Sequence, residues 1–347
     1  MRLPLLLATL LLIGCTESPD PIVIRPPQAP RTADFNVRKE VRRIGFGGCA
    51  GDACSLSLLD TLAARRPDVF IWIGDNVMPQ HPDSLASAYR ALGQDSSFLR
   101  MKSATRMLAT WDDSDGGDKE AFLNFWEDPV KSVRRQREGV YASYLFDGAR
   151  RDVLVVLLDT WSFRSAPNAV EGVAMQYADG GRYYADFLPV ADPDSTVLGP
   201  AQWAWLTDQM SIPCDLRILA TPMPFGPSFN GLSTWANYPH EQHRMLQALA
   251  DEEGDRTTTL FLSGGAHYGE LSRIDSTLFP GLPPLYDLTS SSLAAVPGRP
   301  TENTQRIGSP VATHNAGLVQ FDTRDDVLID LELLATPPSE GARWELQ

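Results

Sequence analysis

The sequence DVFIWIGD, residues 68–75, decides the fold class of this protein. Five consecutive apolar residues, Val69 to Ile73, precede a glycine and an aspartate. An apolar run of this length without alternation is typical of a β-strand covered on both faces, as in the parallel sheets of α/β proteins. The sequence DVLVVLLD (152–159) has the same pattern and predicts a second buried strand.

Strand-like and helix-like segments alternate on both sides of this stretch. Strands are predicted at VRRIGFGG (41–48), RMLATW (106–111), VYASYLF (140–146), LRILAT (216–221), TTTLFLSGG (257–265), LYDLTSS (285–291), NAGLVQFDT (315–323) and VLIDLELL (327–334). Helices are predicted at 57–66, 83–103, 119–128, 199–210 and 237–252. Helices alternate with strands early and strands accumulate late, which predicts an α/β (α+β) fold of two packed sheets flanked by helices. Residues 160–198 are polar and aperiodic, and a long loop is expected there.

The composition is that of an acidic globular protein. The chain has 347 residues, of which 43% are hydrophobic and 21% charged, enough for one large domain or two small ones. Its formal net charge is −14. Because binding to phosphate backbones requires a basic face, no nucleic-acid-binding surface is expected.

The first fifteen residues, MRLPLLLATLLLIGC, have the pattern of an export signal. Arg2 precedes an apolar run from Leu3 to Ile13, which is too short to span a bilayer. The run ends in Leu-Ile-Gly-Cys, which resembles a bacterial lipobox and predicts that Cys15 carries a lipid anchor. The alternative is an ordinary secretory signal that is cleaved nearby. The lipobox interpretation places the protein on the bacterial cell envelope, anchored in the membrane and facing the periplasm or the cell exterior.

The domain boundaries are predicted from composition. After the lipoprotein signal peptide (1–15), residues 16–40 are rich in proline and lack apolar periodicity, so they are predicted to form a tether. The folded domain is expected at 41–335, followed by a C-terminal tail at 336–347.

Cys49 has two interpretations from the residues alone. It could form a short-loop disulfide with Cys54, and Cys214 is then expected to be a buried thiol. Residues 47–51 also fit G-x-C-x-G, the pattern of a nucleophile elbow in a Cys–His–Asp hydrolase. The elbow is the weaker interpretation, because too few strands precede it and it leaves the aspartates after other strands unexplained.

Glycine-rich or acidic clusters follow four of the predicted strands. They are GGC (47–49), GDN (74–76), WDDSD (111–115) and SGGAH (263–267). Because loops at the carboxyl ends of strands converge in α/β sheets, these clusters are expected to meet at one site. Gathered carboxylates repel one another unless solvent or a cation offsets their charge. Asp112 or Asp115 could instead cap the helix predicted near Lys119.

Taken in order, these segments resemble the PhoD-like metallophosphatases, a family of calcineurin-like metallophosphoesterases, over about residues 42–334. The segments that end at GGCAGD, IGDNV and TWDDSD resemble the family's F-G-S-C, G-D-N-x-Y and A-T-W-D-D-H-D. GVYAS, LDTWSFR, LGPAQWAWL, SGGAHYGELS and LTSSSL resemble its G-V-Y-x-S, L-D-T-R-x-x-R, L-G-x-x-Q-W-x-W-L, S-G-D-V-H-Y-x-E-L-S and L-T-S-S-G-L. The resemblance implies a metallophosphoesterase-like sandwich of two mixed β-sheets with flanking helices.

The resemblance also implies a site for metal-dependent phosphoester hydrolysis, in which cations bind phosphate oxygens and activate water. The implied metal ligands are Cys49, Asp75 as the bridging aspartate, Asp113 at the second metal, and His267. Asp113, Ser114 and Asn76 are the predicted catalytic positions, with Asn76 and Asp112 beside the ligands.

This chain departs from the family pattern at important positions. Ser114 replaces the histidine of D-D-H-D, and a serine is not a comparable acid near neutral pH. Gly265 replaces the aspartate of G-D-V-H, which removes a metal ligand. Thr221 and Asp118 are the candidates to compensate for missing ligands, and a Ser114→His, Gly265→Asp double replacement is expected to restore a second metal and activity.

Two functions therefore remain open. The first is a lipid-anchored hydrolase of small phosphoesters or phospholipid-like substrates, with an altered metal site that holds at most one tightly bound divalent or trivalent ion. The identity of this ion, whether Ca, Fe, Zn or Mn, stays open. The second is a catalytically inactive relative that binds a ligand or has a structural role.

Overall fold

The computed structural model describes residues 32–51, 55–79, 81, 84–251, 257–275, 279, 281–321 and 328–346. The chain divides into two units, Met1–Arg31 and Thr32–Gln347, and every described element belongs to the second. The predicted signal peptide, the lipidated Cys15 and the first part of the predicted tether lie outside the described residues.

The larger of the two main sheets has eight strands in the order β1-β5-β6-β11-β12-β14-β13-β15. These strands are β1 (Phe35–Arg38), β5 (Ala142–Asp147), β6 (Asp152–Leu157), β11 (Leu216–Thr221), β12 (Thr258–Ser263), β13 (Gly269–Ile274), β14 (Leu285–Ser290) and β15 (Arg306–Val311). Strands β6, β11, β12 and β14 are parallel to one another, whereas β13 runs antiparallel to β14 and β15. The sheet is therefore mixed.

The second main sheet has six strands in the order β18-β17-β16-β2-β3-β4. They are β2 (Arg43–Gly47), β3 (Val69–Ile73), β4 (Arg106–Thr110), β16 (His314–Phe321), β17 (Ile329–Thr336) and β18 (Ala342–Leu346). The first three are parallel, and the last three pair antiparallel. Parallel pairs require crossover connections, and helices supply them between β2 and β3 and between β3 and β4.

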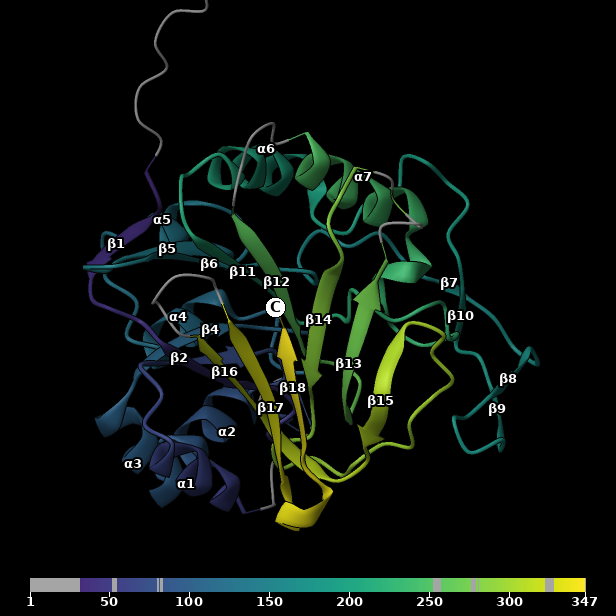
Figure 1. The fold of residues 1–347 in the computed structure, drawn as a ribbon, viewed down its shortest axis with the longest axis horizontal. Helices are drawn as coiled ribbons and strands as arrows, with labels where there is room; N and C mark the ends of the chain where they lie inside the picture. The colour runs from purple at the N-terminus through teal and green to yellow at the C-terminus, as the bar shows by residue number, and fades with distance from the viewer. Residues whose placement is uncertain are drawn as a thin grey trace, which may run out of the picture. The chain divides into compact units, whose positions relative to one another are not determined.

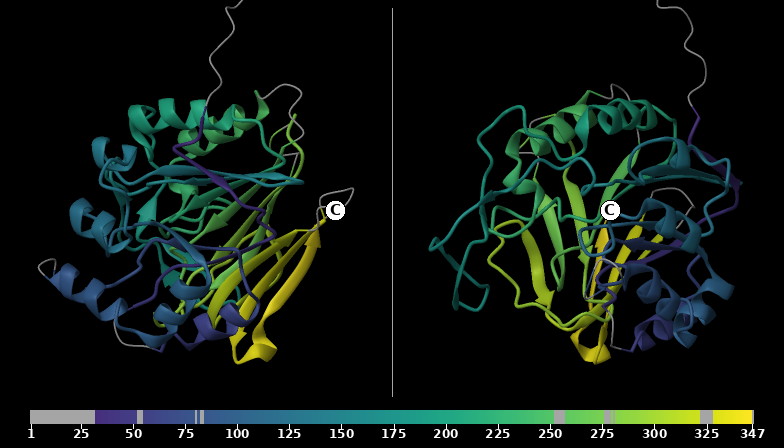
Figure 2. Two further views of the ribbon diagram at one scale, coloured as in Figure 1. Left: turned by 90° about the vertical axis from the view of Figure 1, so that its left-hand side faces the viewer. Right: turned by 180° about the vertical axis from the view of Figure 1, so that it is seen from behind.

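The two sheets pack face to face around one core, and helices cover their outer faces. Strand β3 explains the uninterrupted apolar run: Ile71 faces the core between the sheets, and Trp72 packs under the helices on the other side. The helices over the six-stranded sheet are α1 (Ser57–Ala64), α2 (Leu85–Leu92), α3 (Ser96–Ala104) and α4 (Lys119–Phe125). Helices α6 (Gly199–Met210) and α7 (Pro239–Ala250) cover the eight-stranded sheet, on the opposite side of the strands from α1–α3 (Figures 1 and 2). The predicted sandwich of two mixed sheets with flanking helices is confirmed.

Several boundaries differ from the sequence-based predictions. The region predicted as a tether, 16–40, contains β1, whose Phe35 ring stacks on Tyr144 of β5 with centroids 4.7 Å apart. The predicted tail contains β18, which pairs with β17. The helix predicted over 83–103 is two helices, because the side chain of Asp95 accepts a hydrogen bond from Phe98 N and starts α3 anew.

The long segment 160–198 has little regular structure, as predicted. It contains two short antiparallel pairs, β7 (Asn168–Ala169) with β10 (Phe187–Leu188) and β8 (Ala174–Gln176) with β9 (Arg182–Tyr184). A helix of one turn, α5 (Val133–Gln136), precedes β5. Within the part of the chain that the structure describes, no helix combines the length and the apolar character that crossing a membrane requires.

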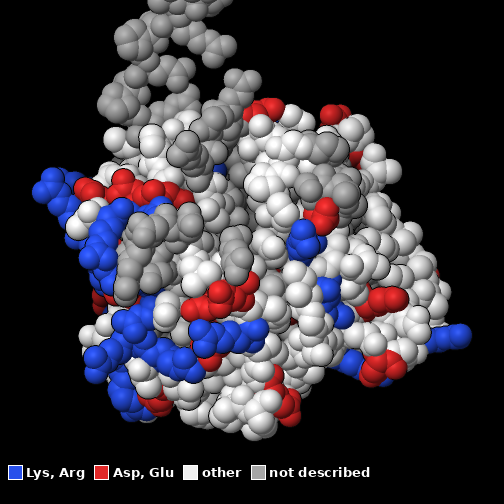
Figure 3. All heavy atoms as spheres, viewed as in Figure 1, with Lys and Arg blue, Asp and Glu red and all other residues white. Residues whose placement is uncertain are grey.

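Basic side chains gather on one face despite the net negative charge of the chain. Figure 3 shows Lys and Arg concentrated over the region of α1, α3 and β2. Several of these arginines lie beside acids: Arg65 pairs with Glu332 at 2.8 Å, and Arg100 with Asp60 at 2.7 Å. Such pairs reduce the positive field of this face. The expectation that the protein has no nucleic-acid-binding surface stays a prediction.

Candidate metal centre

The predicted ligands follow the carboxyl ends of strands in both sheets. Cys49 follows β2, Asp75 follows β3, Asp113 follows β4, and His267 follows β12. Cys49, Asp75 and His267 all have left-handed backbones, with φ of 54°, 51° and 60°. Side-chain-bearing residues adopt this conformation at a cost of roughly 1–3 kcal/mol, and such strain is common at functional sites.

Two glycines allow the strand ends to approach one another. A Cβ atom added at Gly48 would lie 2.7 Å from the carbonyl oxygen of Ile73, and one added at Gly264 would lie 2.4 Å from the same oxygen. No side chain fits at either position, so the loops after β2 and β12 can close on the end of β3 only because both residues are glycine. The GG pairs of the sequence therefore bring Cys49 and His267 to Asp75.

The ligand atoms form two groups that share Asp75. Cys49, Asp75 and His267 offer one ligand atom each, all within 4.8 Å of one another. Asp75, Asp112 and Asp113 form a second such group. Cys49, Asp75 and Asp112 are buried, whereas Asp113 is exposed and His267 half-buried. Asp112, expected beside the ligands, thus belongs to the same group as Asp113, with a ligand atom within 4.8 Å of one on Asp75.

Burial and mutual repulsion disfavour the charged forms of these groups. Burial raises the pKa of the Cys49 thiol well above its usual value, and the charge of Asp75 raises it further. Burial, followed by the charge of Asp113, raises the pKa of Asp75. Burial and the charge of Asp75 raise the pKa of Asp112, while the positive charge of Arg164 opposes this shift. Negative charges gathered out of water need protons or a cation to offset them.

Two buried oxygens in this cluster lack hydrogen-bond partners. They are Oδ1 of Asp112 and Oδ1 of Asn76, whose residues are 8% and 0% exposed. The Asn76 amide nitrogen donates to Thr110 O at 2.8 Å and to Asp115 Oδ2 at 2.6 Å, which determines the orientation of the amide. Buried polar atoms are rarely left unpaired. The carboxylate crowding and the unpaired oxygens both fit cation binding.

Asp115 organises the centre, a role that the sequence analysis did not identify. Its carboxylate accepts hydrogen bonds from Asn76 N (3.1 Å), Asn76 Nδ2 (2.6 Å), Tyr89 Oη (2.8 Å) and Asp112 N (2.9 Å). Burial raises its pKa to about 7. It does not cap the next helix, because Asp118 does so by accepting from Ala121 N at 3.0 Å. Asp115 therefore joins the loops after β3 and β4, which carry the three aspartates of the second group.

Ser114 contacts Asp75. Its backbone N–H donates to Asp75 Oδ1 at 3.1 Å, and its hydroxyl also hydrogen-bonds this carboxylate. Both contacts favour the charged form of Asp75. Ser114 is thus placed to orient a ligand carboxylate.

The residues expected to replace the missing ligands have other partners. The Thr221 hydroxyl donates to Met223 O at 2.9 Å and accepts from Trp235 Nε1 at 3.0 Å, and Asp118 is a helix cap. Gly265 has a φ of 73°, and an added Cβ would lie 2.9 Å from Pro222 O. A Gly265→Asp replacement is therefore strained here, so the restoring double variant would require Pro222 to move.

Cys49 is free, and Cys54 lies outside the described residues. The Sγ atom of Cys49 accepts a hydrogen bond from Ser291 Oγ at 3.1 Å and lies 3.7 Å from Asp75 Oδ2. A nucleophilic cysteine requires a lowered pKa and access to substrate. The raised pKa and full burial of this thiol oppose the nucleophile-elbow interpretation, whereas a bound metal would favour the thiolate.

Comparison with known proteins agrees with this fold. A family model described as PhoD-like phosphatase matches residues 118–333, which is more than half of the chain. No curated protein sequence matches the chain. The matched range contains His267 and Arg164, whereas Cys49, Asp75 and Asp113 precede it.

Three solved structures have a similar fold at low sequence identity. A structure of PhoD has a TM-score of 0.61 and 14% identity, over 91% of this chain and 72% of that chain. A purple acid phosphatase from yellow lupin (Lupinus luteus) has a TM-score of 0.55 and 12% identity, over 91% of this chain and 54% of that one. A dimetal phosphatase from Danio rerio has a TM-score of 0.53 and 10% identity, over 89% and 99%. The fold and the extent of the family match lead to one conclusion: the chain belongs to the PhoD-like phosphatase family.

Proposed function

We propose that this protein is a metal-dependent phosphoester hydrolase with an altered metal centre. The main support for this proposal is that two groups of possible metal ligands share Asp75. The groups are Cys49–Asp75–His267 and Asp75–Asp112–Asp113. Crowded buried carboxylates and unpaired oxygens support cation binding there. Small phosphoesters or phospholipid-like molecules are the proposed substrates.

The donor atoms of the two groups suit different cations. Thiolate with imidazole and carboxylate suits zinc or iron, whereas an all-carboxylate group suits calcium or manganese. A bound cation would supply Lewis acidity toward phosphate oxygens and lower the pKa of water. The second group lacks a ligand at Gly265 and relies on the exposed Asp113. We therefore expect one tightly bound metal at Cys49, Asp75 and His267 and weaker binding at the second group.

The chain's own residues limit the chemistry. Ser114 holds Asp75 and offers no proton at neutral pH to a departing alkoxide. A general acid is typically worth about 10²–10⁴-fold in rate. Substrates whose leaving groups are stable as anions, such as aryl phosphates, should therefore react faster than alkyl phosphates.

Elemental analysis and phosphatase assays test this proposal together. Purified protein is expected to retain one metal per chain after gel filtration and to hydrolyse aryl phosphate mono- or diesters slowly when divalent metal is added. Two tightly held metals, or turnover at the roughly 10 per second of an ordinary enzyme, would show that the centre is intact and not altered. Metal binding without hydrolysis of any ester tested would support the alternative, a catalytically inactive protein that keeps the site for ligand binding.

We also propose that the domain is a lipoprotein of the bacterial cell envelope, with a signal peptide at 1–15. The support is the sequence alone: an apolar run that ends in Leu-Ile-Gly-Cys15, followed by a proline-rich segment. Cys15→Ser should release the protein from the membrane fraction and slow its processing, and a Cys214→Ser variant is the matched control. A Cys15→Ser protein that stays membrane-bound with unchanged gel mobility would contradict the lipid anchor.

A further inference from the structure

Arg164 lies on the loop that covers the acidic segment of the metal centre. The loop follows β6, and its Trp161 packs on Gly116: an added Cβ there would lie 2.7 Å from Trp161 Cε3. The Trp161 ring also meets Trp111 edge-on, with centroids 5.8 Å apart. Trp111 and Gly116 lie on either side of Asp112 and Asp113 in sequence, so this loop is packed against the segment that carries them.

The guanidinium group of Arg164 has only weak partners. Its Nη1 atom lies 3.6 Å from Met223 Sδ and 3.3 Å from Ser233 Oγ. Among the residues that the structure describes, no carboxylate lies within 4.0 Å of Arg164 to form an ion pair. A guanidinium carries five N–H donors in a planar fork, and thioether sulfur is a poor acceptor. Arg164 therefore keeps most of its hydrogen-bonding capacity.

Three other arginines of the fold with little exposure are paired with acids. Arg137 pairs with Asp34 at 2.6 Å, Arg306 with Glu270 at 2.5 Å, and the buried Arg134 with Asp128 at 3.6 Å. The half-buried Arg164 has no such acid partner among the described residues, although the acidic cluster is near. An arginine without a carboxylate partner beside such a cluster has its fork free for a ligand.

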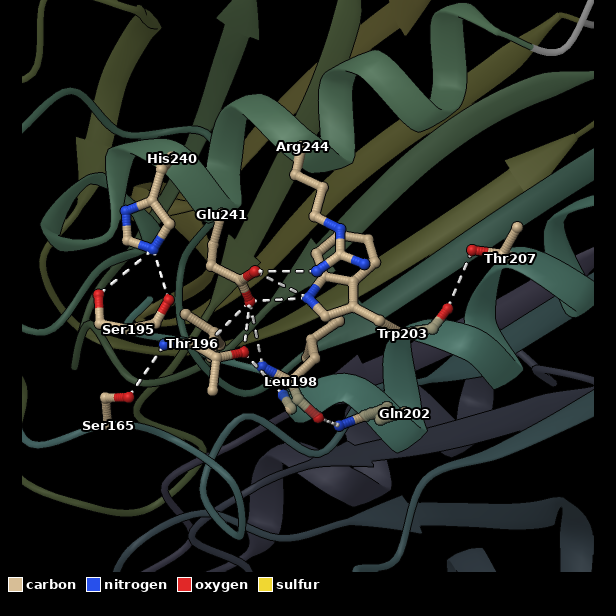
Figure 4. Close-up of polar contacts among 12 residues, drawn as sticks. Ser165, Ser195, Thr196, Leu198, Gln202, Trp203, Thr207, His240, Glu241 and Arg244 are labelled. Carbon is tan, nitrogen blue, oxygen red and sulfur yellow. Dashed lines mark hydrogen bonds and ion pairs between the residues drawn. The ribbon is translucent and has the colours of Figure 1, made fainter. Parts of the chain in front are cut away.

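The backbone beside Arg164 is held by partly buried hydrogen bonds. Ser165 N donates to Thr196 O at 2.8 Å, Thr196 N donates to Ser165 Oγ at 2.9 Å, and Tyr238 Oη donates to Ser165 O at 2.6 Å. Figure 4 shows how Glu241 of α7 extends this network. Its carboxylate accepts from Thr196 Oγ1 and Trp203 Nε1 at 2.9 and 2.7 Å. The position of Arg164 is therefore set by packed elements of the fold.

The partners of Arg164 connect it to the metal centre. Met223 follows Pro222, and a Cβ added at Gly74 would lie 3.0 Å from Pro222 Cβ and 2.9 Å from Asp112 Cβ. The turn that Arg164 contacts thus packs against the residue before Asp75.

We propose that Arg164 binds the phosphate group of the substrate at the edge of the metal centre. The planar fork of arginine matches two oxygens of a phosphate, which gives charge-assisted, paired hydrogen bonds. The inference rests on the proposed function, because it takes the ligand of this site to be a phosphoester or inorganic phosphate. Asp112 and Asp113, on the segment that this loop packs against, would with Asp75 hold a cation beside such a phosphate.

Binding of inorganic phosphate to full-length, metal-loaded protein tests the inference without relying on turnover. Titration calorimetry should give an affinity about 10- to 100-fold lower for Arg164→Met than for wild type, since hydrogen bonds to charged groups are the strong ones. Arg164→Lys should lie between them, because lysine keeps the charge and loses the fork. Metal content and melting temperature should not change. Arg100→Met, which removes an exposed arginine of α3, is the matched control and should bind phosphate like wild type.

The outcomes separate this inference from the proposed function. Equal phosphate affinities in wild type and Arg164→Met would overturn the role of Arg164, even if the protein hydrolyses esters. Loss of metal from Arg164→Met and Arg164→Lys alike would also overturn it, because the residue would then support the metal centre. Wild-type protein that binds phosphate through Arg164 but hydrolyses nothing would defeat the hydrolase proposal and leave this inference standing.

Discussion

Replacing Asp75 by asparagine is expected to remove the metals and lower phosphoester hydrolysis by at least about 10³-fold, since metal stabilisation of the transition state amounts to several kcal/mol. Asp75 is the one residue that both ligand groups share. Asparagine tolerates the left-handed backbone at this position, so the loop should keep its conformation. Elemental analysis and aryl phosphate assays measure the loss, and Asp194→Asn, at an exposed aspartate of the long loop, is the control.

The same variant should be more stable than wild type once metal is removed. Burial and the charge of Asp113 raise the folded-state pKa of Asp75 above its unfolded value, so the charged form destabilises the chelated protein. This penalty is present above the folded pKa and disappears as the pH falls through it. With chelator at pH 8, Asp75→Asn should therefore melt higher, by about 2–4 °C for each kcal/mol of repulsion removed. A lower melting temperature than chelated wild type would contradict the proposed crowding of charge.

Asp115→Ala is expected to have the second largest effect, this time on stability and metal affinity together. Four donors from Asn76, Tyr89 and Asp112 lose their acceptor. Each unsatisfied buried donor costs about 1–3 kcal/mol, and partial access of water leaves an expected loss of about 3–5 kcal/mol. Because three of these four donors belong to the loops after β3 and β4, affinity for added metal should also fall. Chemical denaturation and metal titration measure the two effects.

Tyr89→Phe is the matched control for Asp115, because it removes one of the four donors and leaves the carboxylate. It should cost about 1 kcal/mol and leave metal affinity nearly unchanged. An Asp115→Ala protein as stable as Tyr89→Phe would show that the loops around Asp75 and Asp112 hold their positions without this carboxylate.

The sequence is most informative where local pattern and packing agree. The run Val69–Ile73 predicts β3 because both faces of this strand are buried. Placement of polar clusters after strands predicts that Cys49, Asp75, Asp113 and His267 come together, and the structure places them around Asp75. Their role as metal ligands stays a prediction, as does the catalytic role of Asn76 and Ser114.

The features that local pattern could not predict depend on distant partners. Strand β1 is short and stands among prolines, and it forms because β5, more than a hundred residues later, offers its edge. Asp115 resembles the neighbouring aspartates in sequence, and it accepts four bonds only because the fold brings Asn76 and Tyr89 to it. Arg164 follows Asp159 by only five residues in the sequence. Asp159 instead accepts bonds from Val140 N and Ser162, which leaves the arginine available.

The division of the ligands between two sheets has a consequence for the order of assembly. Cys49 and Asp75 follow strands of the six-stranded sheet, whereas His267 follows a strand of the eight-stranded sheet. The two sheets meet at a parallel β-bridge between Gly48 and Ser291. Neither sheet holds the full ligand set alone. A chain in which the two sheets have not yet docked could therefore not bind a cation with its final affinity. A cation held by this ligand set would therefore be taken up only after the two sheets have docked, among the last events of maturation.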